Sequence, residues 1–286
     1  YTTLFRSLPL AQLHRIVNLA STYSLTKDIQ LKGEYAMSNR DFNRFSTLDK
    51  LNNGNAVDVA VHYSPSKIIF GTTNFGSLDI TLSERYLDKN FSPLDRINSI
   101  EYNRRWGIDS TIINQSLSEE TREGRIAYQP IEKITVGGEF GTVEREKKFR
   151  SLRQEGFVEI AKDSFPKIKY DIENIMSDDN IANAKSDWLR QKGNIGYSWK
   201  NITPSFRYEN EQRLIKNSDT LLNSSFLFSE YAPKITFSDI FGIQTSAEYS
   251  MRFDNVAIER ELIPESKAIT QSYDASFQKV QNFSTS

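Results

Sequence analysis

Cysteine is absent from this chain of 286 residues, and only two histidines are present. The missing cysteine excludes disulfides, thiolate metal ligands and a cysteine nucleophile. A zinc site or a Ser-His-Asp triad needs histidine within a defined group, and the sequence offers no histidine pair. We interpret His14 and His62 as structural residues and expect no catalytic residue, no metal ion and no cofactor. The sequence therefore predicts a protein that is not an enzyme.

Long hydrophobic runs and an excess of charge of one sign are also missing. Hydrophobic residues make up 38% of the chain, and no run approaches the roughly 18 to 20 apolar residues of a membrane-spanning helix. A spanning β-strand needs only about 10 residues, half of them facing lipid, so a low mean hydropathy does not exclude a membrane. The 36 basic and 37 acidic residues nearly cancel, which leaves no basic footprint for nucleic acid.

What the sequence does contain is alternation of apolar and polar residues with a period of two. This pattern is typical of a β-strand with one apolar and one wet face, and the 12% of aromatic residues suits such strands. Period 2 describes each of these segments better than the helical period of 3.6. The alternation is clearest in residues 17–25, 31–37, 57–63, 78–83, 167–173, 194–199, 206–209 and 246–253.

The connections between these segments are of two kinds. Tight turns are predicted at residues 26–28, 64–67, 162–166 and 200–204, and longer charged loops at residues 38–55, 177–191 and 211–224. Short turns at one end and long loops at the other are typical of an up-and-down β-barrel in a bacterial outer membrane.

The spacing of the turns gives a strand number. Turn centres are predicted near residues 27, 66, 131, 164, 202 and 237. Most successive centres are about 33 to 39 residues apart, which is the length of one hairpin and its loop. The interval of 65 residues between 66 and 131 is close to two such units and predicts a missed turn near residues 107–111. We therefore expect about 14–16 strands in an all-β, up-and-down antiparallel transmembrane β-barrel, or a large portion of one. Residues 1–286 form one such segment, and residues 281–286 resemble a strand cut short, so we expect a fragment of a longer chain.

Charged residues of both signs fall on the polar faces of the predicted strands. Abundant carboxylates would suit a glycosidase by residue type, but mixed signs are typical of the wet interior of a barrel. We therefore predict a pore-lining rather than a catalytic role for this face. The residues predicted to line the lumen are Lys32, Glu34, Asp58, Asp79, Lys169, Asp171, Arg207, Glu209, Glu248 and Arg252.

Three other motifs have a functional and a structural interpretation. The Asp- and Asn-rich loops at residues 41–43 and 88–90 could offer oxygen ligands to calcium, but neither has the spacing of a known loop, so we favour hairpin caps. Residues 137–141 lack the Lys-Ser/Thr of a phosphate loop, and we place these glycines in a strand. Trp106, Trp188 and Trp199 are assigned to an interfacial aromatic girdle, with packing at strand ends as the alternative.

One eight-residue repeat, Phe45 to Asn52 and Phe91 to Asn98, follows the pattern Phe-Ser-x-Leu-Asp-[Lys/Arg]-[Leu/Ile]-Asn. We expect both copies at the long-loop rim. Together with residues 100–106 and the Gly-x-Tyr-x-Trp strand pattern, the repeat resembles large outer-membrane β-barrels of Bacteroidota and Ignavibacteria-like bacteria. The resemblance implies an outer-membrane location, lipid as a partner, short periplasmic turns and long external loops. It implies no catalytic residue, and the solute stays open.

Two other classes of protein fit parts of the pattern. A soluble or extracellular all-β binding protein, such as an adhesin, would show the same alternation if the apolar face met a second sheet. The regular contrast between short turns and long loops argues against it. An outer-membrane enzyme with its site at the rim is the other alternative, and no motif supports it. We predict a polar-lined pore, an export channel or a surface anchor in an outer membrane.

Overall fold

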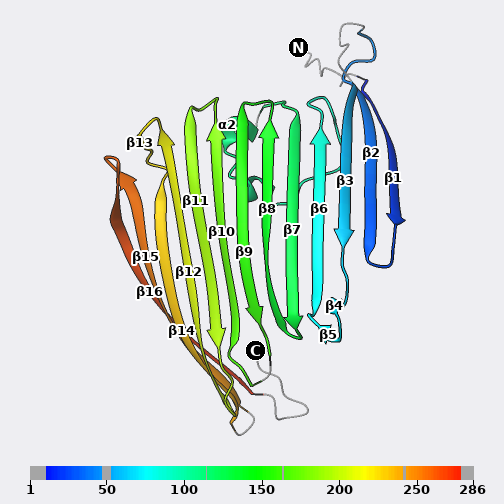
Figure 1. The fold of residues 1–286 in the computed structure, drawn as a ribbon. Helices are drawn as coiled ribbons and strands as arrows, with labels where there is room; N and C mark the ends of the chain where they lie inside the picture. Colours follow the sequence, from blue (N-terminus) through cyan, green and yellow to red (C-terminus); the bar gives the residue numbers. More distant parts are fainter. Residues whose placement is uncertain (1–10, 47–52, 114, 163, 241–242, 278–286) are drawn as a thin grey trace, which may run out of the picture.

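The computed structural model describes residues 11–46, 53–113, 115–162, 164–240 and 243–277. One large antiparallel sheet of 14 strands contains nearly all of the regular structure, and a small sheet of two strands lies beside it (Figure 1). The described residues contain two short helices, α1 (Tyr102–Arg105) and α2 (Ser110–Ile113). No helix within these ranges is long and apolar enough to cross a membrane.

Thirteen strands form a continuous path in chain order, and the short β13 pairs with β12 beside it. The strands of the path are β1 (Leu13–Ser24), β2 (Ile29–Asp41), β3 (Asn53–Tyr63), β6 (Ser77–Leu87), β7 (Glu119–Ile131), β8 (Ile134–Arg145), β9 (Phe149–Ile160), β10 (Lys167–Asp179), β11 (Ala184–Gly196), β12 (Ile202–Asn217), β14 (Phe226–Ile240), β15 (Ile243–Ile258) and β16 (Glu261–Phe277). The remaining strands are β4 (Ile69–Phe70), β5 (Thr73–Asn74) and β13 (Thr220–Leu221).

Every strand of the path pairs antiparallel with the strand before and after it. This arrangement confirms the predicted up-and-down antiparallel sheet and a strand number within the predicted range. Within the described residues, β1 pairs only with β2 and β16 only with β15, so the sheet is open at both edges.

The predicted contrast between short turns and long loops is only partly right. The predicted turns near residues 27, 131 and 164 do lie together, at what we call the turn end of the sheet (Figure 1). At the opposite loop end, however, residues 177–191 are not a loop, because β10 and β11 run almost into one another around residues 180–183. Residues 211–217 likewise belong to β12. Residues of opposite charge face each other across these strand ends, as Asp178 faces Lys185 and Arg150. The polar composition of the segment therefore did not distinguish paired strand ends from a loop.

Two turn predictions were misplaced. No hairpin turn between strands lies near residues 107–111; residues 88–118 instead form one long connection between β6 and β7 that carries α1 and α2. The turn predicted near residue 237 falls within β14, which continues to Ile240, and the connection at residues 241–242 lies outside the described residues. Residues 47–52 of the predicted loop and repeat, and residues 281–286, are also outside them.

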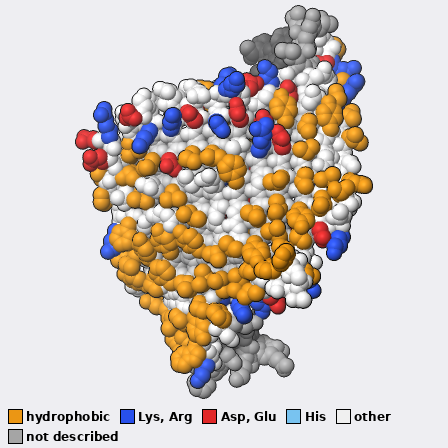
Figure 2. All heavy atoms as spheres, in the orientation of Figure 1, with side chains coloured by type: hydrophobic (Ala, Val, Ile, Leu, Met, Phe, Trp, Pro, Cys, Tyr) orange, Lys and Arg blue, Asp and Glu red, His pale blue; other side chains and the backbone are white. Residues whose placement is uncertain are grey.

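The two faces of the sheet differ in chemistry. We call the face that carries α1 and α2 the helix face and the opposite one the apolar face. Figure 2 shows the apolar face: hydrophobic side chains form a broad band toward the turn end, and charged side chains form a row toward the loop end. Val17, Leu82 and Ile269 are examples of large apolar side chains exposed on this face. The alternation in the sequence therefore does sort the residues by face.

The only hydrophobic cluster found among the described residues lies on the helix face. It is built from Tyr102, Trp106, Ile108 and Ile112 of the long connection, together with Val143 of β8 and Phe149 of β9. Apart from this cluster, most large apolar side chains of the sheet are exposed on the apolar face. A soluble protein of the same length would bury most of them.

Candidate functional site

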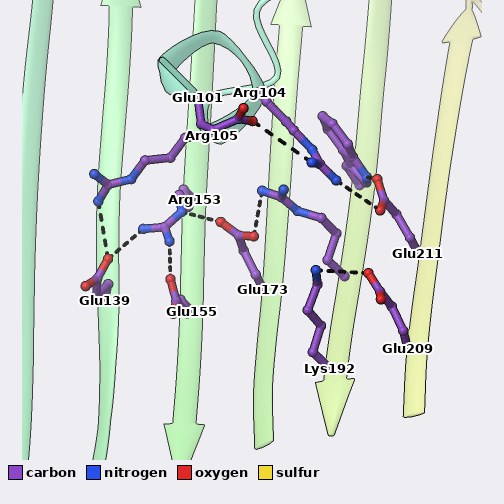
Figure 3. A network of polar contacts seen from close by, with 12 residues as sticks. Glu101, Arg104, Arg105, Glu139, Arg153, Glu155, Glu173, Lys192, Glu209 and Glu211 are labelled. Carbon is purple, nitrogen blue, oxygen red and sulfur yellow. Dashed lines mark hydrogen bonds and ion pairs between the residues drawn. The ribbon is translucent and has the colours of Figure 1, made fainter. Parts of the chain in front are cut away.

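The candidate site is the helix face where the β6–β7 connection folds over the sheet. Figure 3 views this face with α1 above strands that carry a row of charged side chains. Tyr102 and Trp106 are four residues apart, so one turn of helix places both rings against the sheet, with 6.5 Å between ring centroids. Trp106 is fully buried. The connection is therefore packed against the helix face and is not a free loop.

Glycine makes room for this tryptophan. A β-carbon at Gly141 of β8 would lie 2.6 Å from Cη2 of Trp106 and 3.1 Å from the backbone oxygen of Arg122. Just after α1, Gly107 adopts a φ of 61° and ends the helix against Ile175. The glycines predicted to lie in a strand, residues 137–141, do so in β8, where close packing explains them better than phosphate binding.

Substitution of Gly141 by alanine is expected to lower the free energy of unfolding by about 1–3 kcal/mol, because a methyl group would overpack the buried Trp106 ring. The matched control is Gly33→Ala in β2, where no atom lies within 4 Å of the new β-carbon. Chemical denaturation of both variants measures the difference. Equal losses in the two variants would show that Trp106 does not occupy the space at Gly141.

Ion pairs attach the connection to strands that are distant in sequence. Arg105 contacts Glu123 of β7 at 2.6 Å and Glu139 of β8 at 3.2 Å. Arg104 contacts Glu211 of β12 at 3.3 Å. The side chains of Arg105 and Arg104 reach to opposite sides of α1, so these pairs fix the short helix above the helix face (Figure 3).

A further pair joins the end of the helical segment to β12. Asp109 accepts two hydrogen bonds from Arg213, at 2.8 and 3.0 Å. Both bonds come from the same guanidinium nitrogen, Nη2, so a single donor atom holds both carboxylate oxygens of Asp109.

The start of β7 contains a buried carboxylate. Glu119 accepts hydrogen bonds from the Tyr102 hydroxyl at 2.7 Å, from Arg85 at 3.1 Å and from Arg145 at 2.7 Å. The guanidinium groups of Arg85 and Arg145 compensate the buried negative charge of Glu119. An unpaired carboxylate at this position would carry a large desolvation cost. Burial, and next the charge of Glu119, raise the pKa of the Tyr102 hydroxyl above its ordinary value, so this group stays a proton donor.

Below α1, side chains of alternating sign form a ladder across β8 to β12. Arg153 of β9 is its centre: it contacts Glu139 at 2.8 Å and also pairs with Glu155 and Glu173. Its side chain is only 8% exposed. Glu173 in turn pairs with Arg190 of β11 at 2.6 Å. The helix face is thus polar but locally neutralised.

The ladder continues on both sides. Toward β15, Arg207 contacts Glu230 at 2.9 Å and Glu248 at 3.1 Å. Toward β3, the ring of His62 lies 2.7 Å from Asp79, and Arg125 lies between Asp79 and Glu139. These contacts are diagonal in the strand register, since His62 is opposite Thr81 and Arg207 is opposite Ala232. Diagonal neighbours are still within reach of long side chains.

All ten predicted lumen residues lie on the helix face. Strand register places Glu34 opposite Asp58, Asp171 opposite Lys192, and Glu230 between Glu209 and Arg252. The structure brings several of them into contact with partners: Arg207 with Glu248, Lys192 with Glu209, Asp79 with His62, Arg252 with Asp254 and Glu34 with Asn18. Lys32 and Lys169 share this face by register. That this face lines a lumen stays a prediction.

Sequence reasoning missed the centre of the site. Arg153, Glu173 and Arg190 were not among the predicted residues, although Ser151, Arg153 and Glu155 already alternate with a period of two in residues 149–160. That alternation could have placed Arg153 on the polar face. Only one feature of the sequence indicated that α1 packs against the sheet: Tyr102 and Trp106 are four residues apart, the spacing of one helical face.

The interpretation of the tryptophans as an interfacial girdle is wrong for Trp106 and Trp188, and for Trp199 it stays a prediction. Trp199 is 62% exposed beside the turn end, as a girdle residue would be. Trp106 and Trp188 are buried on the helix face instead. Trp188 donates a hydrogen bond to Glu211 at 2.9 Å, and Arg213 lies over its ring at 4.6 Å. A tryptophan near a strand end fits both an interfacial girdle and packing at the strand end. The face of the sheet on which its ring lies decides between the two.

At the loop end, the Asp- and Asn-rich segments form local caps. The backbone N–H of Asn43 donates to Asp41 at 2.9 Å, and that of Asn90 donates to Asp88 at 2.8 Å. Side-chain-to-backbone bonds of this kind were the favoured interpretation of these segments.

No protein-family model matches the chain, and no curated protein matches it. Two solved structures of the outer-membrane protein OmpT of Vibrio cholerae, folded in vitro, show a distant likeness. The trimer form has 10% identity and a TM-score of 0.37, with 92% of this chain and 94% of that chain covered. The other form has 9% identity and a TM-score of 0.33, with 92% of each chain covered. TM-scores this low carry no inference about function.

Proposed function

We propose that this chain forms the wall of an outer-membrane β-barrel whose polar lumen lets small hydrophilic solutes pass without catalysis. The helix face would line the lumen, and the apolar face would contact lipid. The observation that carries this proposal is the segregation of the two faces. Large apolar side chains are exposed on one face of nearly every long strand, while the ionic ladder lies on the other. A water-soluble sheet would bury the apolar face instead.

The height of the apolar band supports a membrane. On β10 the outward residues from Ile168 to Met176 are apolar except Asn174, and the charged Asp178 follows. Nine strand residues tilted by about 40° cover roughly 23 Å, close to the band of about 25 Å on known barrels. The charged row in Figure 2 then lies above the band, at the level of lipid headgroups.

Exposed aromatic residues gather at the turn end. Phe70 on the β4–β5 hairpin is 81% exposed, and Phe165 in the β9–β10 connection and Trp199 in the β11–β12 connection are also exposed. Aromatic rings at one edge of an apolar band are typical of the membrane interface. Short turns in such barrels face the periplasm, so we assign the turn end to that side and the loop end to the outside.

The packed β6–β7 connection would narrow the lumen. A ring of 14 strands tilted by about 40° measures roughly 28 Å across its backbones. The segment with α1 and α2 would lie inside such a ring, because ion pairs of Arg104, Arg105 and Asp109 attach it to the helix face of β7, β8 and β12. A narrowed, charge-compensated lumen suits small polar solutes better than a folded protein.

Labelling of neighbouring residues tests the assignment of the faces. Val59 of β3 lies on the apolar face with 45% exposure, and Asp58 lies on the helix face beside Glu34. Since the chain has no cysteine, single cysteines at these positions report only themselves. In intact outer membranes, a water-soluble thiol reagent is expected to modify position 58 at least tenfold faster than position 59. A lipid-phase probe should show the reverse order.

The outcome that overturns the proposal is protection of position 59 from both probes, because that result would place Val59 in a protein core. It would favour the all-β binding protein in which a second sheet covers the apolar face. Positions 60 and 61 repeat the test one pair further along β3, with Ala60 on the helix face and Val61 on the apolar face.

A further inference from the structure

A group of amide side chains interrupts the apolar face of the sheet. Strand register aligns one row of apolar-face positions from β3 to β14: Val61, Leu82, Gly124, Phe140, Gln154, Asn174, Leu189, Gln212 and Leu227. The row has apolar side chains or glycine from β3 to β8, and amides on β9, β10 and β12. In the next row toward the turn end, Gln191 of β11 is directly opposite Asn210 of β12. We call these five amide residues of β9 to β12 the amide patch.

The amide patch lies within the height of the apolar band. Each amide of the first row is four residues from a charged residue near the loop end of its strand: Gln154 from Arg150, Asn174 from Asp178, and Gln212 from Lys216. Four residues of a strand tilted by about 40° cover roughly 10 Å, well inside a band of about 25 Å. Figure 2 shows an uncharged white region in the middle of this face, with hydrophobic side chains on its loop-end and turn-end sides. In the proposed membrane the patch lies in hydrocarbon, where lipid tails offer no hydrogen-bond partner.

Three amides of the patch have no hydrogen-bond partner within the described part of the chain. The side chains of Gln154, Asn174 and Gln212 make no hydrogen bond there, and the Oδ1 atom of Asn174 is buried. Gln191 and Asn210 are bonded to side chains of neighbouring strands, at 2.8 Å each. An amide carries both donors and an acceptor, and it is costly in an apolar environment without partners. The patch therefore fits a surface that both donates and accepts hydrogen bonds.

We propose that the amide patch is the contact between two copies of this chain in the outer membrane. Because every amide donates and accepts, the uncharged patch is complementary to itself. A two-fold axis along the membrane normal brings the same patch of a second copy to the same depth, with both copies in the same orientation. This inference rests on the proposed membrane location, because water would satisfy the amides of a sheet in solution.

The charges above the patch suit a two-fold axis between β10 and β11. Asp178 of β10 and Lys185 of β11 are directly opposite one another in the strand register. The axis sets β10 of one copy against β11 of the other, so Asp178 of each copy faces Lys185 of the second copy. The like charges of Arg150 and Lys216 lie further from the axis, at the level of the headgroups, where water reaches them.

The lengths of the amide side chains suit the same axis. It sets β9 of one copy against β12 of the other, so Gln154 faces Gln212 of the second copy. Two convex walls separate with distance from the axis. The longer glutamine side chains of the first row stand on these outer strands, and the shorter Asn174 stands next to the axis on β10.

Photo-crosslinking in the full-length protein in native outer membranes tests the proposal. Benzoylphenylalanine replaces Leu189, which lies between Asn174 and Gln212 in the row. The matched control carries the same probe at Leu82, in the same row on β6. Position 189 is expected to give a product with the mass of two copies, linked through β9 to β12 of the second copy, in at least tenfold higher yield than position 82.

A triple variant tests the amides themselves. Gln154→Leu, Asn174→Leu and Gln212→Leu together remove the three amides that have no partner within the described residues. Leucine suits contact with lipid, so the variant should remain in the membrane. The yield of the two-copy product from position 189 is expected to fall at least tenfold in this variant.

Four results would overturn a contact between copies. A link from position 189 to a different protein would assign the patch to another partner, and no two-copy product would leave it facing lipid. Equal yields at positions 189 and 82 would show random collision, and an undiminished yield in the triple variant would show that the amides are not needed. The proposed function fails separately: recovery of the protein outside the membrane fraction overturns the pore, whereas a conducting protein without the two-copy product overturns only the contact.

Discussion

Replacement of Trp106 by alanine is expected to release the β6–β7 connection from the helix face and, in the proposed pore, to raise single-channel conductance severalfold. The side chain is fully buried among Tyr102, Val143 and Phe149, and its loss removes the centre of the only hydrophobic cluster among the described residues. Truncation of a buried tryptophan costs about 3–5 kcal/mol. That cost exceeds what the partly exposed ion pairs of α1 contribute, at about 0–1 kcal/mol each.

Three measurements check this expectation. Planar-bilayer recording gives the conductance, denaturation in vesicles gives the loss of stability, and trypsin reports exposure of Arg104 and Arg105. Trp199→Ala, an exposed tryptophan at the turn end, serves as the control and should change stability by about 1 kcal/mol or less. If trypsin cleaves the connection in the Trp106 variant while conductance stays unchanged, the connection does not narrow the lumen.

Replacement of Arg153 by glutamine is expected to make the pore prefer cations. Arg153 lies among Glu139, Glu155 and Glu173. Glu139 keeps its contacts with Arg105 and Arg125, and Glu173 keeps Arg190, so the loss of Arg153 leaves one excess negative charge, with Glu155 deprived of its ion-pair partner. Unpaired carboxylates along a lumen attract cations and repel anions. Stability should fall by up to about 3 kcal/mol, because removal of one partner of a buried ionic cluster leaves its charges uncompensated, although lumen water screens part of the effect.

The reversal potential in a salt gradient measures the selectivity. Lys192→Gln removes the same charge at an exposed position that pairs with Glu209 alone, so it should change both selectivity and stability much less. The double variant Arg153→Gln with Glu155→Gln restores the local balance and should return most of the selectivity. A reversal potential identical in the wild type and the Arg153 variant would place this ladder outside the conducting path.

The sequence predicted the sheet and the sorting of its residues by face, because both follow from local rules. Side chains alternate across a strand whatever the strand pairs with, so period 2 placed all ten predicted lumen residues on one face. Short connections make sequential strands antiparallel neighbours. The turns that sequence reasoning overlooked lack the usual signals: Glu146 and Lys147, and likewise Glu259 and Arg260, adopt positive φ without glycine, asparagine or proline at those positions.

Only the tertiary structure decided what lies on the helix face. Arg104 and Glu211 meet across 107 positions of sequence, and no local pattern encodes a contact of that kind. Trp106 and Trp199 occupy similar places in the sequence pattern, yet one is buried under α1 and the other is exposed at the turn end. The sequence by itself determined which side chains share a face, because strand geometry is local. The pairing register and the fold of the β6–β7 connection determined which of those side chains meet, because that depends on strands far apart in the chain.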